Sequence, residues 1–88
     1  DGVPLLPADI PRPEWMATLS QEFEKFSARV DAGEHTALDP YGAQAPEEFF
    51  AVASEAFFVS PKAARQEHPG LYALLVRYYR TDPATSAA

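Results

Sequence analysis

The sequence predicts an all-α protein of about four helices that follow an extended, proline-rich segment. Apolar residues recur at spacings of three and four along most of the chain, which is the period of a helix, and no stretch shows the alternation of a half-buried strand. Prolines also stand where these patterns begin, and the first turn of a helix tolerates proline because its N–H would be unpaired there. The expected helices are residues 13–32, 46–59, 61–67 and 69–81.

The first part of the chain is a lead-in followed by an amphipathic helix. Residues 1–12 hold three prolines and a glycine, so we expect an extended segment that lies against the core. The helix at 13–32 ends at Gly33, a residue that favours the left-handed cap. Its large side chains are expected to form core rather than a ligand site, and they are Trp15, Leu19, Phe23, Phe26 and Val30.

A loop is predicted at residues 34–44, because Asp39-Pro40 and Gly42 are turn signals. Tyr41 is the largest side chain of this loop, and by default such a tyrosine packs with its hydroxyl at the surface. His35 has polar neighbours and is expected to be exposed.

The helix at 46–59 is apolar nearly all round, which indicates burial on every side. Glu48 and Glu55 lie seven residues apart in one stripe of this helix, about 20° from the same line. A buried carboxylate must be paired, protonated or bound to a metal. The alternative is that both glutamates lie on a solvated strip or pair with an arginine. Four short helices cannot cover every face of this helix, so we expect its Glu48/Glu55 side to need a further partner.

The last two helices are short, and proline marks both of their starts. The helix at 61–67 is mostly polar, and His68 is expected to be a boundary residue rather than a metal ligand. The helix at 69–81 should pack through its leucines and be stopped by Asp82-Pro83. We therefore predict a single helical domain at 1–83 and a disordered tail at 84–88.

Composition excludes several classes of protein. A length of 88 residues allows one small domain, and a net charge of −6 argues against a nucleic-acid backbone as partner. The chain has no cysteine, which excludes disulfides and thiolate metal sites and fits a cytoplasmic location. It shows no signal peptide and no apolar run near the ~20 residues that span a membrane. There is no initiator methionine, which fits a piece of a longer protein.

Four segments carry a family resemblance: residues 38–43, 46–58, 68–72 and 78–83. The motifs Asp-Pro-Tyr and Glu-Phe-Phe-Ala-Val-Ala-Ser-Glu, in this order, are similar to those of the Mlc titration factor A family of glucose-regulated bacterial zinc peptidases. Residues 1–4 resemble the segment that follows the HExxH helix of that family. HExxH itself is absent, because neither His35 nor His68 begins such a motif. The chain thus resembles the C-terminal part of such an enzyme.

The resemblance implies roles for three residues. Glu48 matches the glutamate that is the third protein ligand of zinc, beside two histidines of the absent helix. Tyr41 matches a tyrosine that hydrogen-bonds the developing oxyanion, and a loop tyrosine can swing into place when substrate binds. Glu55 resembles a carboxylate that orients a zinc-bound histidine. The whole enzyme is thus expected to hold zinc, to cleave a peptide substrate in the manner of an aminopeptidase, and to contact the glucose repressor Mlc.

Without HExxH, this chain alone is expected to be inactive and to hold no zinc. The competing hypothesis is a non-catalytic helical module for protein–protein interaction. The exposed apolar side of the helix at 46–59 would be covered by the HExxH helix in an enzyme. In an isolated chain the same side is expected to drive self-association.

Overall fold

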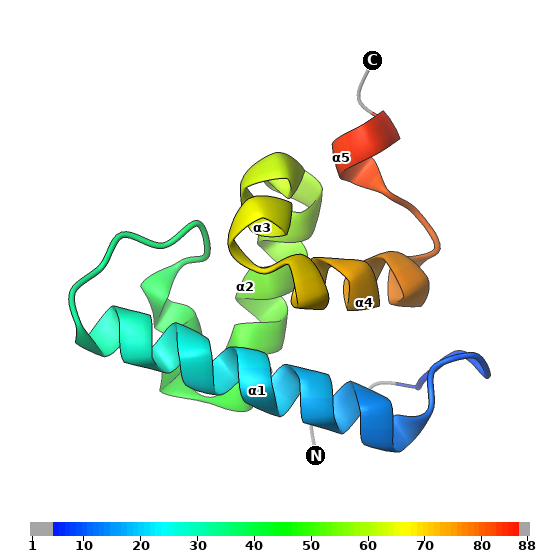
Figure 1. Cartoon of the computed structure of the whole chain (residues 1–88), viewed down its shortest axis with the longest axis horizontal. Coiled ribbons are helices and arrows are strands. Elements are labelled where there is room, and N and C mark those ends of the chain that lie inside the picture. The colour runs from blue at the N-terminus through cyan, green and yellow to red at the C-terminus, as the bar shows by residue number, and fades with distance from the viewer. Residues whose placement is uncertain (1–4, 87–88) are drawn as a thin grey trace.

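The computed structural model describes residues 5–86, and every regular element within this range is a helix (Figure 1). The all-α prediction is confirmed, and the observed bounds of the four predicted helices differ from the expected ones by at most two residues. Residues 1–4, the first part of the predicted lead-in segment, lie outside the described range. The elements are α1 (Arg12–Asp31), the 3₁₀ helix η1 (Pro40–Gln44), α2 (Pro46–Val59), α3 (Pro61–Glu67), α4 (Pro69–Tyr79) and α5 (Pro83–Ser86).

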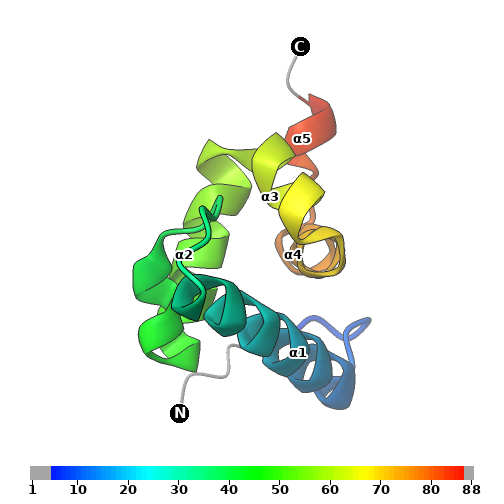
Figure 2. The same ribbon diagram turned by 60° about the vertical axis from the view of Figure 1, so that its left-hand side comes forward.

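The longest helix, α1, crosses one side of the molecule and packs against both α2 and α4. Figure 2 shows α3 between α2 and α4 at the end remote from α1, and α2 and α4 also contact each other directly. The described helices therefore form a frame around the core. None of the helices within residues 5–86 combines the length and the apolar character that a membrane crossing requires.

Aromatic side chains fill this frame. Trp15 is fully buried, with its ring centroid 5.7 Å from that of Phe50 and 5.0 Å from that of Tyr78. Phe49 lies between two rings of α1, 5.6 Å from Phe23 and 5.4 Å from Phe26. Each such buried ring contributes roughly 1.5–3 kcal/mol by leaving water. The prediction that the aromatic residues of the first helix form core is confirmed.

The prediction that α2 is buried on all sides is wrong for this chain. One side of α2 is buried through Phe49, Val52 and Phe57, whereas Phe58 on the opposite side is 52% exposed and Val59, the last residue of the helix, is 74% exposed. The reason is geometric, because α1, α3 and α4 all approach α2 from the same side. The expectation that short helices leave part of α2 uncovered is confirmed.

A residue in the left-handed backbone conformation follows the end of two helices. Gly33 has a φ of 76°, as predicted for the residue that ends α1. Arg80 has a φ of 61°, so α4 ends at Tyr79, two residues before the predicted end. The predicted loop at 34–44 is irregular only to Asp39, because η1 occupies Pro40–Gln44.

The predicted disordered tail is wrong for residues 84–86, which belong to the short helix α5. The Tyr72 hydroxyl donates a hydrogen bond to the Asp82 carboxylate and accepts one of 2.9 Å from the Ala84 N–H, and Ala84 is buried. A buried side chain on α4 therefore holds the start of α5. Residues 87–88 lie outside the described range.

Tyr72→Phe is expected to lower the free energy of unfolding by about 1–2 kcal/mol at pH 7, because both hydrogen bonds of the hydroxyl are lost. Burial, together with the hydrogen bond to Asp82, raises the pKa of the Tyr72 hydroxyl above its ordinary value. A raised pKa stabilises the fold below the unfolded-state pKa near 10, and this contribution is lost as the pH rises through the folded-state pKa. Urea unfolding of both proteins from pH 7 to 11 should show their difference shrinking above pH 10. A difference that stays constant would contradict the assignment.

Candidate functional site

Tyr41 is held in η1, which begins at an Asp-Pro pair. Asp39 caps η1, because its carboxylate accepts a 2.9 Å hydrogen bond from the backbone N–H of Tyr41. The carbonyl oxygen of Asp39 also accepts a 2.9 Å hydrogen bond from the N–H of Gly42. Proline at the next position has its φ already fixed for the turn. The backbone of Tyr41 is therefore fixed on both sides, while its side chain is 56% exposed.

Gly42 brings η1 into close contact with α2. A Cβ atom at this residue would collide with Cγ2 of Val52, and would lie 3.3 Å from Cε2 of Phe26 and 3.4 Å from Cα of Phe49. Only glycine allows the two backbones to approach this closely. Tyr41 precedes Gly42, and Glu48 precedes Phe49. The contact thus brings the backbones of the two residues predicted to act in catalysis and zinc binding to neighbouring positions.

Glu48 lies in the first turn of α2 and is half-buried. Negatively charged side chains are favoured at the N-terminal end of a helix, so a glutamate suits this position. The Glu48 carboxylate makes no hydrogen bond or ion pair to another side chain of residues 5–86.

Glu55 lies two turns further along α2 and is exposed, so its predicted burial is wrong for this chain. It lines an open groove of about 500 Å³ whose opposite wall is the segment from Thr36 to Pro40. The groove lies between the loop and the edge of α2 that carries Val52, Glu55 and Val59, and it reaches Pro40 of η1. None of its lining residues is a histidine. The structure therefore places Glu55 beside the loop that leads to Tyr41, without a group for it to orient.

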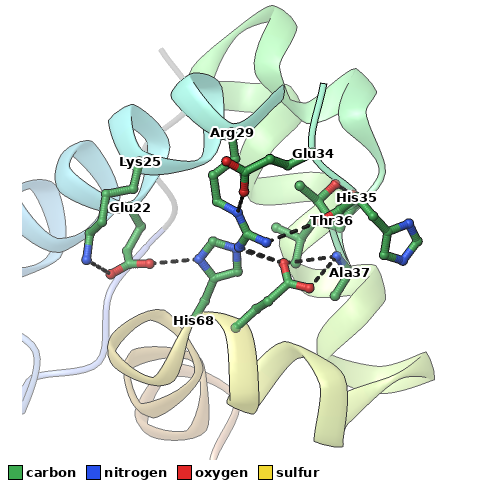
Figure 3. A network of polar contacts seen from close by, with 10 residues as sticks. Glu22, Lys25, Arg29, Glu34, His35, Thr36, Ala37 and His68 are labelled. Carbon is green, nitrogen blue, oxygen red and sulfur yellow. Dashed lines mark hydrogen bonds and ion pairs between the residues drawn. The ribbon is translucent and has the colours of Figure 1, made fainter. Parts of the chain in front are cut away.

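Sequence reasoning missed a network of polar contacts between α1, α3 and the loop after α1 (Figure 3). His68 is the boundary residue between α3 and α4, as predicted, but it is also 3% exposed. Its Nδ1 lies 2.9 Å from Oε1 of Glu22, and Oε2 of Glu22 lies 3.3 Å from Nζ of Lys25. Glu22 falls within the apolar stripe of α1, and a carboxylate at such a position is the signal that could have revealed the pair.

The other half of the network centres on Glu67. Its carboxylate accepts hydrogen bonds from Arg29 and from the backbone N–H of Ala37. His35, which lies in the same loop, has an exposed side chain as predicted. Within residues 5–86, no three His, Cys, Asp or Glu side chains lie close enough together to hold a metal ion.

Comparisons with known proteins agree on one family. Residues 1–80 match the profile described as glucose-regulated metallo-peptidase M90. The chain is 39% identical over 85 residues to Mlc titration factor A of Pectobacterium atrosepticum, covering 93% of this chain and 31% of that protein. It is 37% identical over 71 residues to Mlc titration factor A of Edwardsiella ictaluri, covering 78% of this chain and 27% of that protein.

A protein of Synechocystis that is itself uncharacterized is 34% identical over 83 residues, covering 94% of this chain and 30% of that protein. The chain therefore spans about three tenths of the length of these curated relatives. No solved structure gives a significant match.

Gly42→Ala is expected to lower the free energy of unfolding by about 1–3 kcal/mol, because the added methyl group overpacks the contact between η1 and α2. Gly70→Ala is the matched control, since a Cβ there would meet only Oε2 of Glu22 at an ordinary 3.5 Å. Urea unfolding followed by circular dichroism measures both. In a Val52→Ala background the cost of Gly42→Ala should fall, because the colliding Cγ2 is gone. Equal effects of the two glycine substitutions would refute the close contact.

Proposed function

The chain belongs to the glucose-regulated metallo-peptidase M90 family, and from this premise we propose that it forms the C-terminal part of a zinc-dependent, aminopeptidase-like metallopeptidase. The observation that supports the proposal most strongly is the close packing of Gly42 on α2. This packing brings the backbone of Tyr41, whose side chain can donate a hydrogen bond, near the backbone of Glu48, whose side chain carries a carboxylate. A peptidase that uses a metal needs both kinds of group around the scissile carbonyl.

Glu48 is the proposed zinc ligand of this chain. Catalytic zinc sites have three protein ligands and one open position, and two histidines with one glutamate are a common set. The described residues contain no such cluster, so this chain supplies one ligand and the two histidines must come from another part of the whole protein. When bound, zinc would polarise the peptide carbonyl and lower the pKa of a water molecule.

Tyr41 is the proposed donor to the oxyanion that forms on the peptide carbonyl. Its backbone is fixed by Asp39 and Gly42, whereas its ring is exposed and can face a substrate. A donor that is held in place before the reaction costs little reorganisation when charge develops.

The uncovered side of α2 is the proposed docking surface for the segment that carries the histidines. Glu55 lies on this side and would orient one zinc-bound histidine by accepting its second ring N–H. Phe58 and Val59 provide the apolar area that such a helix would cover. We further propose that the whole protein is cytoplasmic and contacts the repressor Mlc, for which its relatives are named.

The second candidate function is a non-catalytic interaction module. A groove of about 360 Å³ between α1 and α2 favours it, because its walls include Trp15, Met16, Leu19 and Phe50. Reading the gene upstream of residue 1 distinguishes the two functions. An HExxH motif shortly before the chain supports the peptidase, and its absence supports the module.

The 88-residue chain alone is expected to bind no stoichiometric zinc and to hydrolyse no peptide, since a single carboxylate cannot hold catalytic zinc. Metal analysis after dialysis against zinc, with an aminopeptidase assay on the same sample, measures both. Circular dichroism should first show that the sample is helical. One equivalent of zinc together with turnover would contradict this prediction.

In the whole protein, Glu48→Gln is expected to remove zinc and to lower kcat/KM by more than the roughly 10–100-fold that is typical of groups that only orient a ligand. Helicity should change little, because Glu48 is only half-buried. Glu47→Gln is the matched control, since Glu47 is exposed in the same turn of α2. Unchanged zinc content in Glu48→Gln would refute the ligand assignment.

A further inference from the structure

The loop between α1 and η1 is fastened by a carboxylate from α3. The backbone N–H of Ala37 donates to both oxygens of Glu67, at 3.0 Å and 2.9 Å (Figure 3). Glu67 is the last residue of α3, 30 positions further along the chain. A carboxylate that accepts from a backbone N–H forms a charge-assisted hydrogen bond, which is stronger than a neutral one. Glu67 therefore fixes this point of the loop against α3.

Arg29 of α1 holds both Glu67 and the loop. Its Nη1 donates to Oε1 of Glu67 at 3.0 Å, and its Nη2 donates to the carbonyl oxygen of His35 at 3.2 Å. The Arg29 and Glu67 side chains are only 30% and 23% exposed, so solvent screens this pair less than an open surface pair. Arg29 also contacts the exposed Glu34 through Nε at 3.2 Å. Glu67 is thus held in position by an arginine as it binds Ala37.

The backbone between Ala37 and Tyr41 is restrained by further contacts. Thr36 Oγ1 donates to the carbonyl oxygen of Leu38 at 2.7 Å, and the Leu38 side chain is 1% exposed. Asp39 then caps η1 through the N–H of Tyr41. Between the Glu67 contact and Tyr41, residues 37–39 are thus hydrogen-bonded or buried, and the ring of Pro40 fixes its own φ.

We propose that Glu67 is a positioning residue for Tyr41. It fixes the loop at Ala37, four residues before Tyr41, and so restrains the backbone that carries the tyrosine. This inference rests on the proposed function, because it gives Tyr41 its role as oxyanion donor. It also restricts the predicted swing of the loop tyrosine to the side-chain torsions, since the backbone on both sides of the residue is fixed.

The test is a double-mutant cycle in the whole protein, read by kcat, KM and zinc content. Tyr41→Phe should lower kcat by about 100-fold, which is the scale of losing one oxyanion donor. Glu67→Ala should lower kcat by roughly tenfold, because a misplacement of about 1 Å can cost up to ~100-fold. KM and zinc content should stay unchanged. In the Tyr41→Phe background, Glu67→Ala should have no further effect on kcat.

Two additional variants separate loss of positioning from loss of folding. Glu67→Asp retains the negative charge and shortens the side chain by one methylene group, so it should fold even where Glu67→Ala does not, and should show the same dependence on Tyr41. Gln66→Ala is the control, since Gln66 is an exposed neighbour in α3. An effect of Glu67 that persists in the Tyr41→Phe background, or an unchanged kcat, would overturn the positioning role. Full kcat in Tyr41→Phe alone would instead refute the role of Tyr41 in the proposed function.

Discussion

The contact between Gly42 and α2 is the constraint on which the arrangement of the site depends. Because residue 42 has no Cβ, η1 can lie against Val52 and the backbone of Phe49. Tyr41 and Glu48 each stand one position away from this contact, so their relative placement follows from it. The ring of Phe26 of α1 also packs against Gly42, from the side of the core. The proposed site needs a hydrogen-bond donor and a carboxylate close together, and the packing of η1 on α2 sets the distance between the backbones that carry them.

Polar contacts add to this packing by fixing α1, α3 and the loop after α1 relative to one another. The core of the molecule is aromatic, yet two carboxylates, Glu22 and Glu67, reach into its edge and each has a cationic or N–H partner. Removing one partner from such a buried pair is costly, because the remaining group loses its hydrogen bond without regaining water. The pairs therefore specify one arrangement of α1, α3 and the loop after α1. In the proposed enzyme this arrangement sets the position of Tyr41.

Local patterns were enough to predict the four longer helices and the cap at Gly33. Proline at a first turn, apolar spacing and glycine after a last turn act over a few residues, so a single sequence reveals them. The uncovered side of α2 and the pairing of His68 with Glu22, 46 positions apart, depend on how helices meet in space. The short elements η1 and α5 depend on caps and side chains that are distant in sequence, such as Tyr72 for α5. Tyr41 and Glu48 were predicted as site residues from their motif, and this remains a prediction, whereas Glu67 has no local signal in the sequence.

The most direct test of the account is a nuclear Overhauser measurement on the folded 88-residue chain. Packing of η1 on α2 through Gly42 predicts strong cross-peaks from the α-protons of Gly42 to a methyl group of Val52 and to the ring protons of Phe26. These cross-peaks should persist across the pH range in which the chain stays helical. Their absence from a well-folded sample would mean that η1 lies away from α2, and that Tyr41 and Glu48 are not brought together by this fold.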